Sequence, residues 1–364
     1  MSVLIFILIL LVLVVSHEFG HFIVAKKSGI RVDEFSFGFP PKLFGVKKGE
    51  TSYNFNALPF GGYVKIFGES PDEESMNGPD SKRSFINKPK YIQAAVLIAG
   101  VVMNFLVAWL LFSVGFMSGL PTSVGAAPQG SIIKNQALTI TDVSKNSPAE
   151  KAGLQTGDKI SHLQSKTDSV DTQTTESIQT FVKNHSGEDI IVSFTRGKET
   201  KQTTVIPELN KTTDTPMIGI SMDVIGTLKL PIYQAVFEGL KLSWNLVIAT
   251  IVGFYTLIHN GLIGHGSLAG VTGPVGIVGV VGNAEKFGFI YLLSFTAIIS
   301  INLAVINLIP FPALDGGRLL FLLIEKIKGS RINPKVANIV NMIGFGLLMV
   351  LMVVITYHDV VKLL

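Results

Sequence analysis

Cysteine is absent from the sequence, and charged residues are scarce. Without cysteine the chain forms neither disulfides nor thiolate metal sites, so any transition-metal site must be built from histidine and carboxylate side chains. Charged residues make up 15% of the 364 residues, against 48% for hydrophobic residues. The mean hydropathy of +0.47 is typical of an integral membrane protein that carries some soluble mass, not of a water-soluble enzyme.

A nucleic-acid partner is not indicated either. The formal net charge is only +4, and no arginine-rich stretch alternates with aromatic residues. The small basic excess belongs to loops between apolar segments.

Long apolar segments predict a multi-pass α-helical membrane protein. Four segments are expected to span the bilayer, and these are residues 2–25, 91–120, 287–309 and 336–356. No lysine or arginine precedes the first segment, whereas Lys26 and Lys27 follow it. This order predicts a retained span, not a cleaved signal peptide, with its N-terminus outside and the lysines in the cytoplasm.

One further apolar stretch, residues 233–260, decides the topology. Trp244 and Lys241 within it favour an interfacial helix, and a re-entrant helix is the alternative. Either arrangement returns residue 315 to the side of the first span's lysines. The basic loop 318–335 supports this prediction, because an excess of lysine and arginine marks cytoplasmic loops.

The segments between the spans differ in composition. In the N-terminal half, residues 1–120, the loop 29–69 has short alternating runs broken by glycine and proline, which predict β-strands. Residues 121–208 are polar and rich in threonine, serine and lysine, so we expect a soluble domain before the C-terminal half, residues 209–364.

The pentapeptide His17-Glu18-Phe19-Gly20-His21 lies at the end of the first apolar run. Two histidines four residues apart share one face of a helix, which is the arrangement in which both bind zinc and the adjacent glutamate acts as general base. Ionisable residues at membrane depth usually have a functional role. The competing interpretation is an inward-facing polar cluster of a proton-coupled transporter. The other histidines are expected on the surface or in loops, and these are His162, His185, His259, His265 and His358.

Asp315 is the candidate for the third metal ligand. Pro310 and Pro312 precede it and end the helix, while Gly316 and Gly317 follow it and allow a sharp turn. Such a break presents one carboxylate at membrane depth, where non-helical backbone is tolerated if protein or a water-filled cavity covers it. Taken alone, Asp315 could also be an ordinary turn aspartate.

Two short strands of the loop 29–69 are candidates for binding an extended peptide. Residues 52–56 and 62–66 are candidate exposed strands for this purpose, because an extended peptide can add to a sheet edge. The candidate substrate-binding residues in or directly before these strands are Tyr53, Phe55, Gly61, Gly62 and Tyr63.

With these motifs the chain resembles the site-2 protease family of intramembrane zinc metalloproteases. The resemblance is to the bacterial regulator-of-sigma-E branch, with one PDZ domain. The motifs that match are His17–His21, Asn-x-x-Pro-x-Pro-x-Leu-Asp-Gly from Asn307, Gly61-Gly62-Tyr63-Val64-Lys65, the PDZ-like run from Asn146 to Asp158, and Gly273-Pro274-Val275-Gly276. These motifs occur in the same order as in the family, and they cover nearly the whole chain. One departure is Gly38-Phe39-Pro40-Pro41, where relatives more often have Gly-Phe-Gly-Pro.

The resemblance implies a zinc-dependent endopeptidase of the cell membrane. One Zn²⁺ would be held by His17, His21 and Asp315, with Glu18 as the catalytic base. Asn302 and Asn307 would bind the substrate backbone, although an intramembrane asparagine such as Asn307 can equally pack helices together.

The implied substrates are single-span membrane proteins already trimmed outside, such as anti-sigma factors or remnant signal peptides. The active site would face the cytoplasm and an α+β PDZ-like domain the outside. That domain would either capture a new peptide C-terminus or exclude bulky substrates.

Two other functions remain open. An ion or metal transporter could use the same histidines and Asp315 as a transit site, although no internal repeat supports it. A non-catalytic PDZ receptor would not need Glu18.

Overall fold

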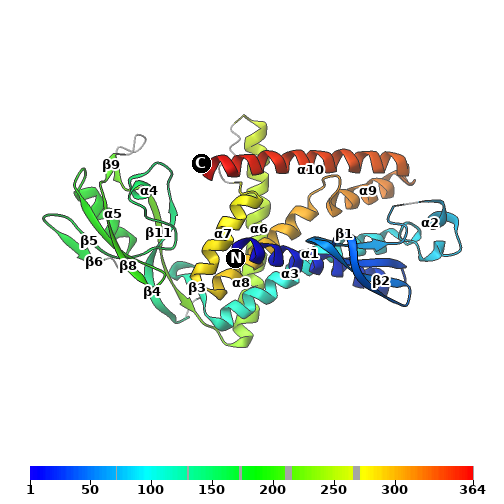
Figure 1. The fold of residues 1–364 in the computed structure, drawn as a ribbon, viewed down its shortest axis with the longest axis horizontal. Helices are drawn as coiled ribbons and strands as arrows, with labels where there is room; N and C mark the ends of the chain where they lie inside the picture. Colours follow the sequence, from blue (N-terminus) through cyan, green and yellow to red (C-terminus); the bar gives the residue numbers. More distant parts are fainter. Residues whose placement is uncertain (71, 129–130, 172–173, 210–214, 265–270, 364) are drawn as a thin grey trace. The chain divides into compact units, whose positions relative to one another are not determined.

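The computed structural model describes the chain except for residues 71, 129–130, 172–173, 210–214, 265–270 and 364 (Figure 1). The histidine prediction at His265 lies outside these described residues. The chain divides into two compact units, and each is described by itself. Unit 1 comprises Met1–Val114 and Ala235–Leu364, and unit 2 comprises Gly115–Gln234.

Unit 1 is mainly helical. Its regular elements are α1 (Ser2–Lys27), β1 (Val32–Lys48), β2 (Thr51–Ile66), α2 (Glu73–Asn77), the short 3₁₀ helices η1 (Ser81–Arg83) and η2 (Phe85–Asn87), α3 (Lys90–Ser118), α6 (Ile232–Leu262), α7 (Pro274–Phe287), α8 (Phe289–Leu308), α9 (Asp315–Lys328) and α10 (Pro334–Leu363). Among the described residues, five helices are long and apolar enough to cross a membrane, namely α1, α3, α6, α8 and α10 up to Val361.

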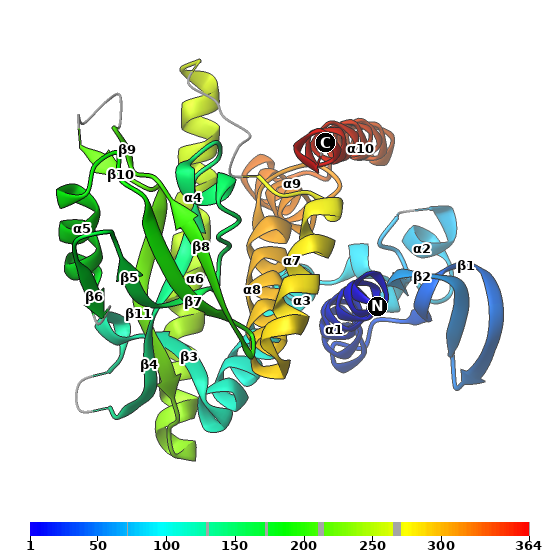
Figure 2. The ribbon, with the colours of Figure 1, turned by 60° about the vertical axis from the view of Figure 1, so that its left-hand side comes forward.

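Helix α6 is the fifth candidate, where the sequence predicts four. It runs without interruption from Ile232 to Leu262, and the re-entrant alternative for residues 233–260 stays a prediction. The helix is uninterrupted because no proline breaks the backbone hydrogen bonds of this segment. In two views α6 runs across the direction of α1 and α10 (Figures 1 and 2). The interfacial alternative stays a prediction.

The β1–β2 sheet lies beside α1. Its register places residues 34–37 opposite both residues 52–55 and residues 62–65, while residues 42–48 pair with 51–56. Residues 52–55 therefore have strand partners on both sides, whereas residues 62–65 pair on one side only. Apolar residues from the sheet, α1 and α3 form one buried cluster, which includes Ala25, Phe35, Val64, Ile66 and Val96.

Unit 2 is a β-rich domain with its own apolar core. A seven-stranded sheet has the order β3-β11-β4-β5-β7-β8, with β6 paired to β5. Its elements are β3 (Leu120–Ser123), η3 (Val124–Ala126), β4 (Ile133–Val143), α4 (Pro148–Lys151), β5 (Lys159–Gln164), β6 (Ser169–Asp171), α5 (Thr175–Asn184), β7 (Ile190–Arg196), β8 (Glu199–Val205), β11 (Ile220–Leu228) and a small hairpin of β9 (Glu208–Leu209) and β10 (Pro216–Met217).

Two polar features of unit 2 are buried. The Asp158 carboxylate accepts hydrogen bonds from the Arg196 guanidinium, at 2.6 Å and 2.7 Å. His185, which we expected on the surface or in a loop, is buried. It caps α5, and its ring stacks on Phe181 with the centroids 4.3 Å apart.

Candidate metal centre

Helix α1 presents His17 and His21 on one face, because four residues make about one helical turn. Both side chains are buried. Their Nε2 atoms lie 3.1 Å apart, and the two rings meet edge to face. The two Nε2 atoms therefore converge on one point.

The Asp315 carboxylate approaches the same point from α9. Its Oδ2 lies 2.9 Å from His17 Nε2 and 3.3 Å from His21 Nε2. The ligand atoms of the three side chains all lie within 4.8 Å of one another. Residues that are 298 positions apart in the sequence thus form one potential metal site.

Two glycines let α1 and α3 approach each other at the histidines. A Cβ atom on Gly20 would lie 2.3 Å from the carbonyl oxygen of Ala99. A Cβ atom on Gly100 would lie 2.5 Å from His21 Nε2 and 2.6 Å from His17 Cε1. The backbone of α3 is therefore one wall of the site.

The turn before α9 is tightly packed around Asp315. Ala313 has a φ of 75°, an uncommon conformation for a residue with a side chain, and its N–H donates to Asn341 Oδ1 at 3.2 Å. A Cβ atom on Gly316 or Gly317 would lie 2.2 Å from a carbonyl oxygen of the preceding turn. Only glycine fits at these two positions, so packing explains the two glycines that follow Asp315.

Glu18 lies next to the converging ligand atoms without being one of them. Its Oε2 accepts a hydrogen bond from the backbone N–H of Val64, at 3.0 Å. Val64 belongs to residues 62–65, the stretch of β2 that pairs on one side only. The candidate base therefore faces the open edge of the sheet.

The other ring nitrogens of the histidines face α3, and sequence analysis missed these partners. His21 Nδ1 lies 2.8 Å from the carbonyl oxygen of Val96, and His17 Nδ1 lies 3.4 Å from the amide nitrogen of Asn104. Val96, Gly100 and Asn104 follow one another at intervals of four residues on one face of α3. The signal available in the sequence was Asn104 itself, a polar residue within an apolar span.

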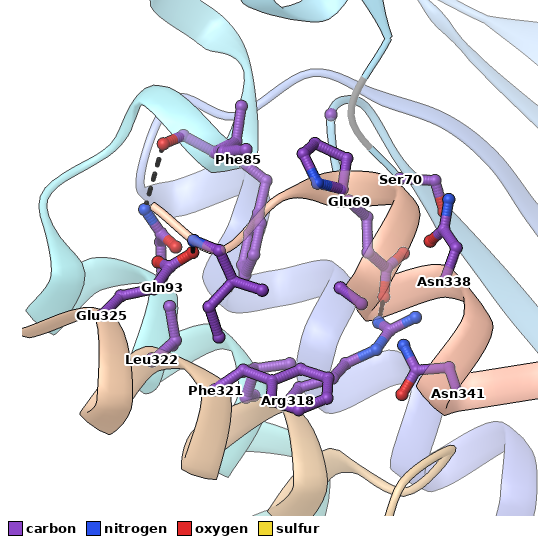
Figure 3. Close-up of a pocket in the computed structure, with 16 residues that line it drawn as sticks. Glu69, Ser70, Phe85, Gln93, Arg318, Phe321, Leu322, Glu325, Asn338 and Asn341 are labelled. Carbon is purple, nitrogen blue, oxygen red and sulfur yellow. Dashed lines mark hydrogen bonds and ion pairs between the residues drawn. The ribbon is translucent and has the colours of Figure 1, made fainter. Parts of the chain in front are cut away.

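A cavity of about 110 Å³, lined by both polar and apolar residues, lies beside α9 (Figure 3). Arg318, one turn after Asp315, forms an ion pair across it with Glu69, which follows β2. On the same helix Glu325 pairs with Lys90 at the start of α3. These ion pairs attach α9 to the N-terminal half of unit 1.

The predicted substrate-binding residues lie in different places. Gly61 and Gly62 lie against Val14 and Val15 of α1, just before the first histidine. Tyr63 donates its hydroxyl hydrogen to Glu34 at 2.9 Å, on the same sheet.

Aromatic residues of the predicted strand 52–56 pack within the sheet. Tyr53 contacts the buried cluster of sheet, α1 and α3, whereas Phe55 is exposed and stacks on Phe44, with ring centroids 5.0 Å apart. Residues 52–55 offer no free edge, so strand addition is left to residues 62–66.

The two asparagines of α8 do not share one environment. Asn302 accepts a hydrogen bond from the hydroxyl group of Thr250 in α6, at 3.1 Å, which is a contact between helices. Asn307 is half-buried and is the last residue but one of α8, before the Asp315 turn.

Comparison with known proteins shows the family of this chain. A family model described as Peptidase family M50 matches residues 5–351. The chain belongs to peptidase family M50. Among relatives of this M50 chain, a predicted zinc metalloprotease of Clostridium acetobutylicum is 37% identical, over 96% of this chain and 94% of the relative. Zinc metalloprotease RasP of Oceanobacillus iheyensis is 29% identical over 100% of this chain and 99% of the relative.

The resemblance to intramembrane zinc metalloproteases is thereby confirmed, and the M50 protein is a metalloendopeptidase with several helices that could lie in a membrane. Among solved structures, the PDZ domain of an SdrC-like protein from Listeria monocytogenes matches 25% of this chain and 92% of that domain. That match has 17% identity and a TM-score of 0.22, and a PDZ role for unit 2 stays a prediction.

The donor set of this M50 site fits zinc. Two imidazoles and one carboxylate with a fourth position left for water are typical of catalytic zinc. His17, His21 and Asp315 supply such a set, and their ligand atoms already converge. The three residues could therefore hold one metal ion.

Proposed function

We propose that this chain is an intramembrane endopeptidase that hydrolyses peptide bonds in or near the membrane-spanning segments of single-span proteins already trimmed outside. His17, His21 and Asp315 hold one zinc ion, and Glu18 is the general base. Anti-sigma factors and remnant signal peptides are the substrate classes that the family resemblance implies.

The convergence of the two motifs carries this proposal. Asp315 Oδ2 lies 2.9 Å from His17 Nε2, although the two residues come from opposite ends of the chain. His17 and His21 belong to α1, which is apolar enough to cross a membrane. Ionisable side chains buried within a membrane-spanning segment usually have a functional role, so this three-residue cluster is the candidate active site.

Glu18 is placed to move protons. When bound, zinc lowers the pKa of a water ligand to about 7 and polarises a carbonyl group. Glu18 adjoins the first ligand on α1, so its carboxylate can take a proton from water and pass it to the leaving amine. The Val64 N–H that donates to Glu18 Oε2 holds the carboxylate at the sheet edge.

The sheet edge at residues 62–66 is where the unwound substrate segment would bind. These residues pair on one side only, and their other side faces α1 and Glu18. A strand added to this edge would satisfy its own backbone groups and would run past the candidate base.

We place the active site toward the cytoplasm and unit 2 outside, with four spans and α6 in the outer interface. Contacts in unit 1 support this topology. Asp359, near the end of α10, accepts hydrogen bonds from the N–H groups of Gly273 and Gly276 at the start of α7. Ser2, at the first turn of α1, lies beside Gly282 of α7.

The start of α7, the end of α10 and the start of α1 thus lie on one side of unit 1. Both Lys90, at the start of α3, and Glu325 of α9 lie at the opposite side, where the chain of α1 also ends. If α6 carried the chain across the membrane, α7 would begin on the wrong side for these contacts.

The test is cleavage of a panel of tagged single-span substrates with trimmed outer domains by the purified chain in detergent. Wild type should cleave. Glu18→Gln should bind one zinc but lose at least about 100-fold in rate, because proton transfer by a positioned side chain contributes 10²–10⁴-fold.

His21→Ala should lose both zinc and cleavage. Cleavage by Glu18→Gln at the wild-type rate would contradict the assignment of the base. Zinc that exchanges across sealed vesicles, with no cleavage by any variant, would favour the transporter.

A further inference from the structure

Asn104 is one of the few buried side-chain polar groups in the described structure with an unpaired atom. The residue is fully buried, and its Oδ1 has no hydrogen-bond partner among the residues that the structure describes. Its Nδ2 lies 3.4 Å from His17 Nδ1. A buried acceptor without a partner destabilises the folded state, so its environment calls for an explanation.

Metal binding fixes which nitrogen of each histidine carries hydrogen. A neutral imidazole has one N–H and one lone pair. If Nε2 gives its lone pair to zinc, Nδ1 must carry the hydrogen and needs an acceptor. The ligand roles of His17 and His21 are those of the proposed function, on which this inference rests.

His21 already has the required partner. Its Nδ1 lies 2.8 Å from the carbonyl oxygen of Val96, and a carbonyl oxygen can only accept. The hydrogen of His21 therefore lies on Nδ1, and its Nε2 lone pair is directed toward His17 and Asp315.

His17 faces the wrong end of the Asn104 amide. Its Nδ1–H would point at Nδ2, which is also a donor, while the acceptor Oδ1 points elsewhere. Rotating the amide by a half turn exchanges the two ends and leaves the shape of the side chain unchanged. Oδ1 would then lie where it can accept the His17 hydrogen.

We infer that Asn104 is the positioning residue of the first metal ligand. Its Oδ1 accepts the hydrogen of His17 Nδ1 and so keeps the Nε2 lone pair directed at the metal. Asn104 does for His17 what the Val96 carbonyl does for His21. Helix α3 thus supplies an acceptor to both histidines, one turn before and one turn after Gly100.

The backbone at Asn104 is held independently of the histidines. The hydroxyl group of the buried Ser300 in α8 donates to the carbonyl oxygen of Asn104, at 2.8 Å. The side-chain amide can therefore rotate without displacing α3, because α8 holds the backbone of Asn104 in place.

Two substitutions of the full chain in detergent separate the possible roles of Asn104. Asn104→Leu has a similar size but no acceptor, so zinc affinity should fall about 10–100-fold, as for other groups that orient metal-binding histidines. Asn104→Asp keeps an acceptor and loses the donor, so it should bind zinc at least as tightly as wild type, because a carboxylate is a stronger acceptor. Zinc affinity is measured by competition with a chelator, independently of cleavage.

Ser113→Ala is the matched control, since Ser113 is a buried polar residue of the same helix whose hydroxyl bonds only locally to Trp109. Its zinc affinity should equal that of wild type. In zinc-loaded wild type, ¹⁵N spectra of labelled histidine should show His17 with its hydrogen on Nδ1.

Two results would overturn the inference. One is wild-type affinity in Asn104→Leu, and the other is an affinity in Asn104→Asp as low as in Asn104→Leu, which would mean that the amide donor is what matters. If Asn104→Leu does not fold, the zinc affinity of Asn104→Asp decides, and an affinity about 10–100-fold below that of wild type would overturn the inference. A wild-type chain that binds no zinc would instead refute the proposed function, whereas zinc lost in His17→Ala but kept in Asn104→Leu would refute only this inference.

Discussion

Glycine at two positions sets the distance between α1 and α3 at the histidines. Gly20 lies between the two candidate metal ligands His17 and His21, where metal binding itself makes no demand on the residue. Its role is steric, because a Cβ atom there would overlap the backbone of Ala99. Gly100 has the corresponding role on α3 and faces both imidazoles.

Replacing Gly100 by alanine should therefore damage the site directly. The new methyl group would lie 2.5 Å from His21 Nε2, so the ring has to move. We expect zinc affinity to fall by about 10-fold or more and stability to fall by about 1–3 kcal/mol, as in other overpacked interiors. Chelator competition and thermal melting of the purified chain measure the two effects.

Gly346→Ala is the control for helix propensity, because a Cβ atom on Gly346 of α10 would meet nothing within 4 Å. This variant should bind zinc like wild type and should be no less stable, since alanine is favoured over glycine in a helix by about 1 kcal/mol. Unchanged zinc affinity in Gly100→Ala would show that the α1–α3 approach does not constrain the ligands.

At the scale of elements, α9 is positioned by polar contacts as well as by apolar ones, since Leu319 and Leu322 pack against the buried cluster of the sheet, α1 and α3. Arg318 pairs with Glu69 and Glu325 pairs with Lys90, on either side of the cavity shown in Figure 3. The turn that precedes α9 is fixed by Asn341 of α10 through the N–H of Ala313. Asp315 is thus held from three other elements, which matters because a metal ligand must keep its geometry.

Helix α6 offers a test of the topology, and the absence of cysteine makes it simple. Single cysteines replace Tyr233 and Leu262, whose side chains are 73% and 83% exposed at the two ends of the helix. If α6 lies in the outer interface, a membrane-impermeant maleimide added to intact cells should label both variants. Labelling of Tyr233→Cys alone would mean that α6 crosses the membrane.

The same cells supply the controls for labelling. The unsubstituted chain has no cysteine and should not react. A cysteine in place of Lys328, in the loop we assign to the cytoplasm, should react only after the cells are opened. Reaction of Lys328→Cys in intact cells would reverse the assigned orientation.

At the scale of the whole molecule, unit 2 is inserted between two parts of unit 1. Its first and last strands pair with each other, with Leu120 opposite Leu228. The entrance and exit of the insertion are therefore neighbours, and none of the candidate ligands or Glu18 belongs to unit 2. Unit 2 also has a separate apolar core around Ile140, Leu163 and Val192.

Replacing residues 122–226 by a short flexible linker should therefore leave zinc binding and the cleavage of short, trimmed substrates in place. The two roles predicted for this domain are separated by the kind of substrate. If unit 2 excludes bulky outer domains, cleavage of untrimmed substrates should increase in the deletion variant. If it captures a peptide C-terminus, cleavage of trimmed substrates should become slower at low substrate concentration and be unchanged at high concentration. Complete loss of zinc in the deletion variant would contradict the separation of the two units.

The sequence alone predicted the parts of this protein whose signal is local. Helical spacing placed His17 and His21 on one face, long apolar runs marked α1, α3, α8 and α10, and composition separated the polar middle segment. The prolines and glycines around Asp315 predicted a helix break, because their effect on the backbone is local too.

Only the tertiary structure decided what depends on contacts between distant segments. It brought Asp315 to the histidines, gave Glu18 a partner in Val64, and placed Asn104 against His17, none of which spacing along one helix can reveal. It also paired residues 52–55 on both sides and left the edge at 62–65 open, since strand register depends on the whole sheet. Local sequence determines what a segment forms, whereas packing between segments determines which side chains meet.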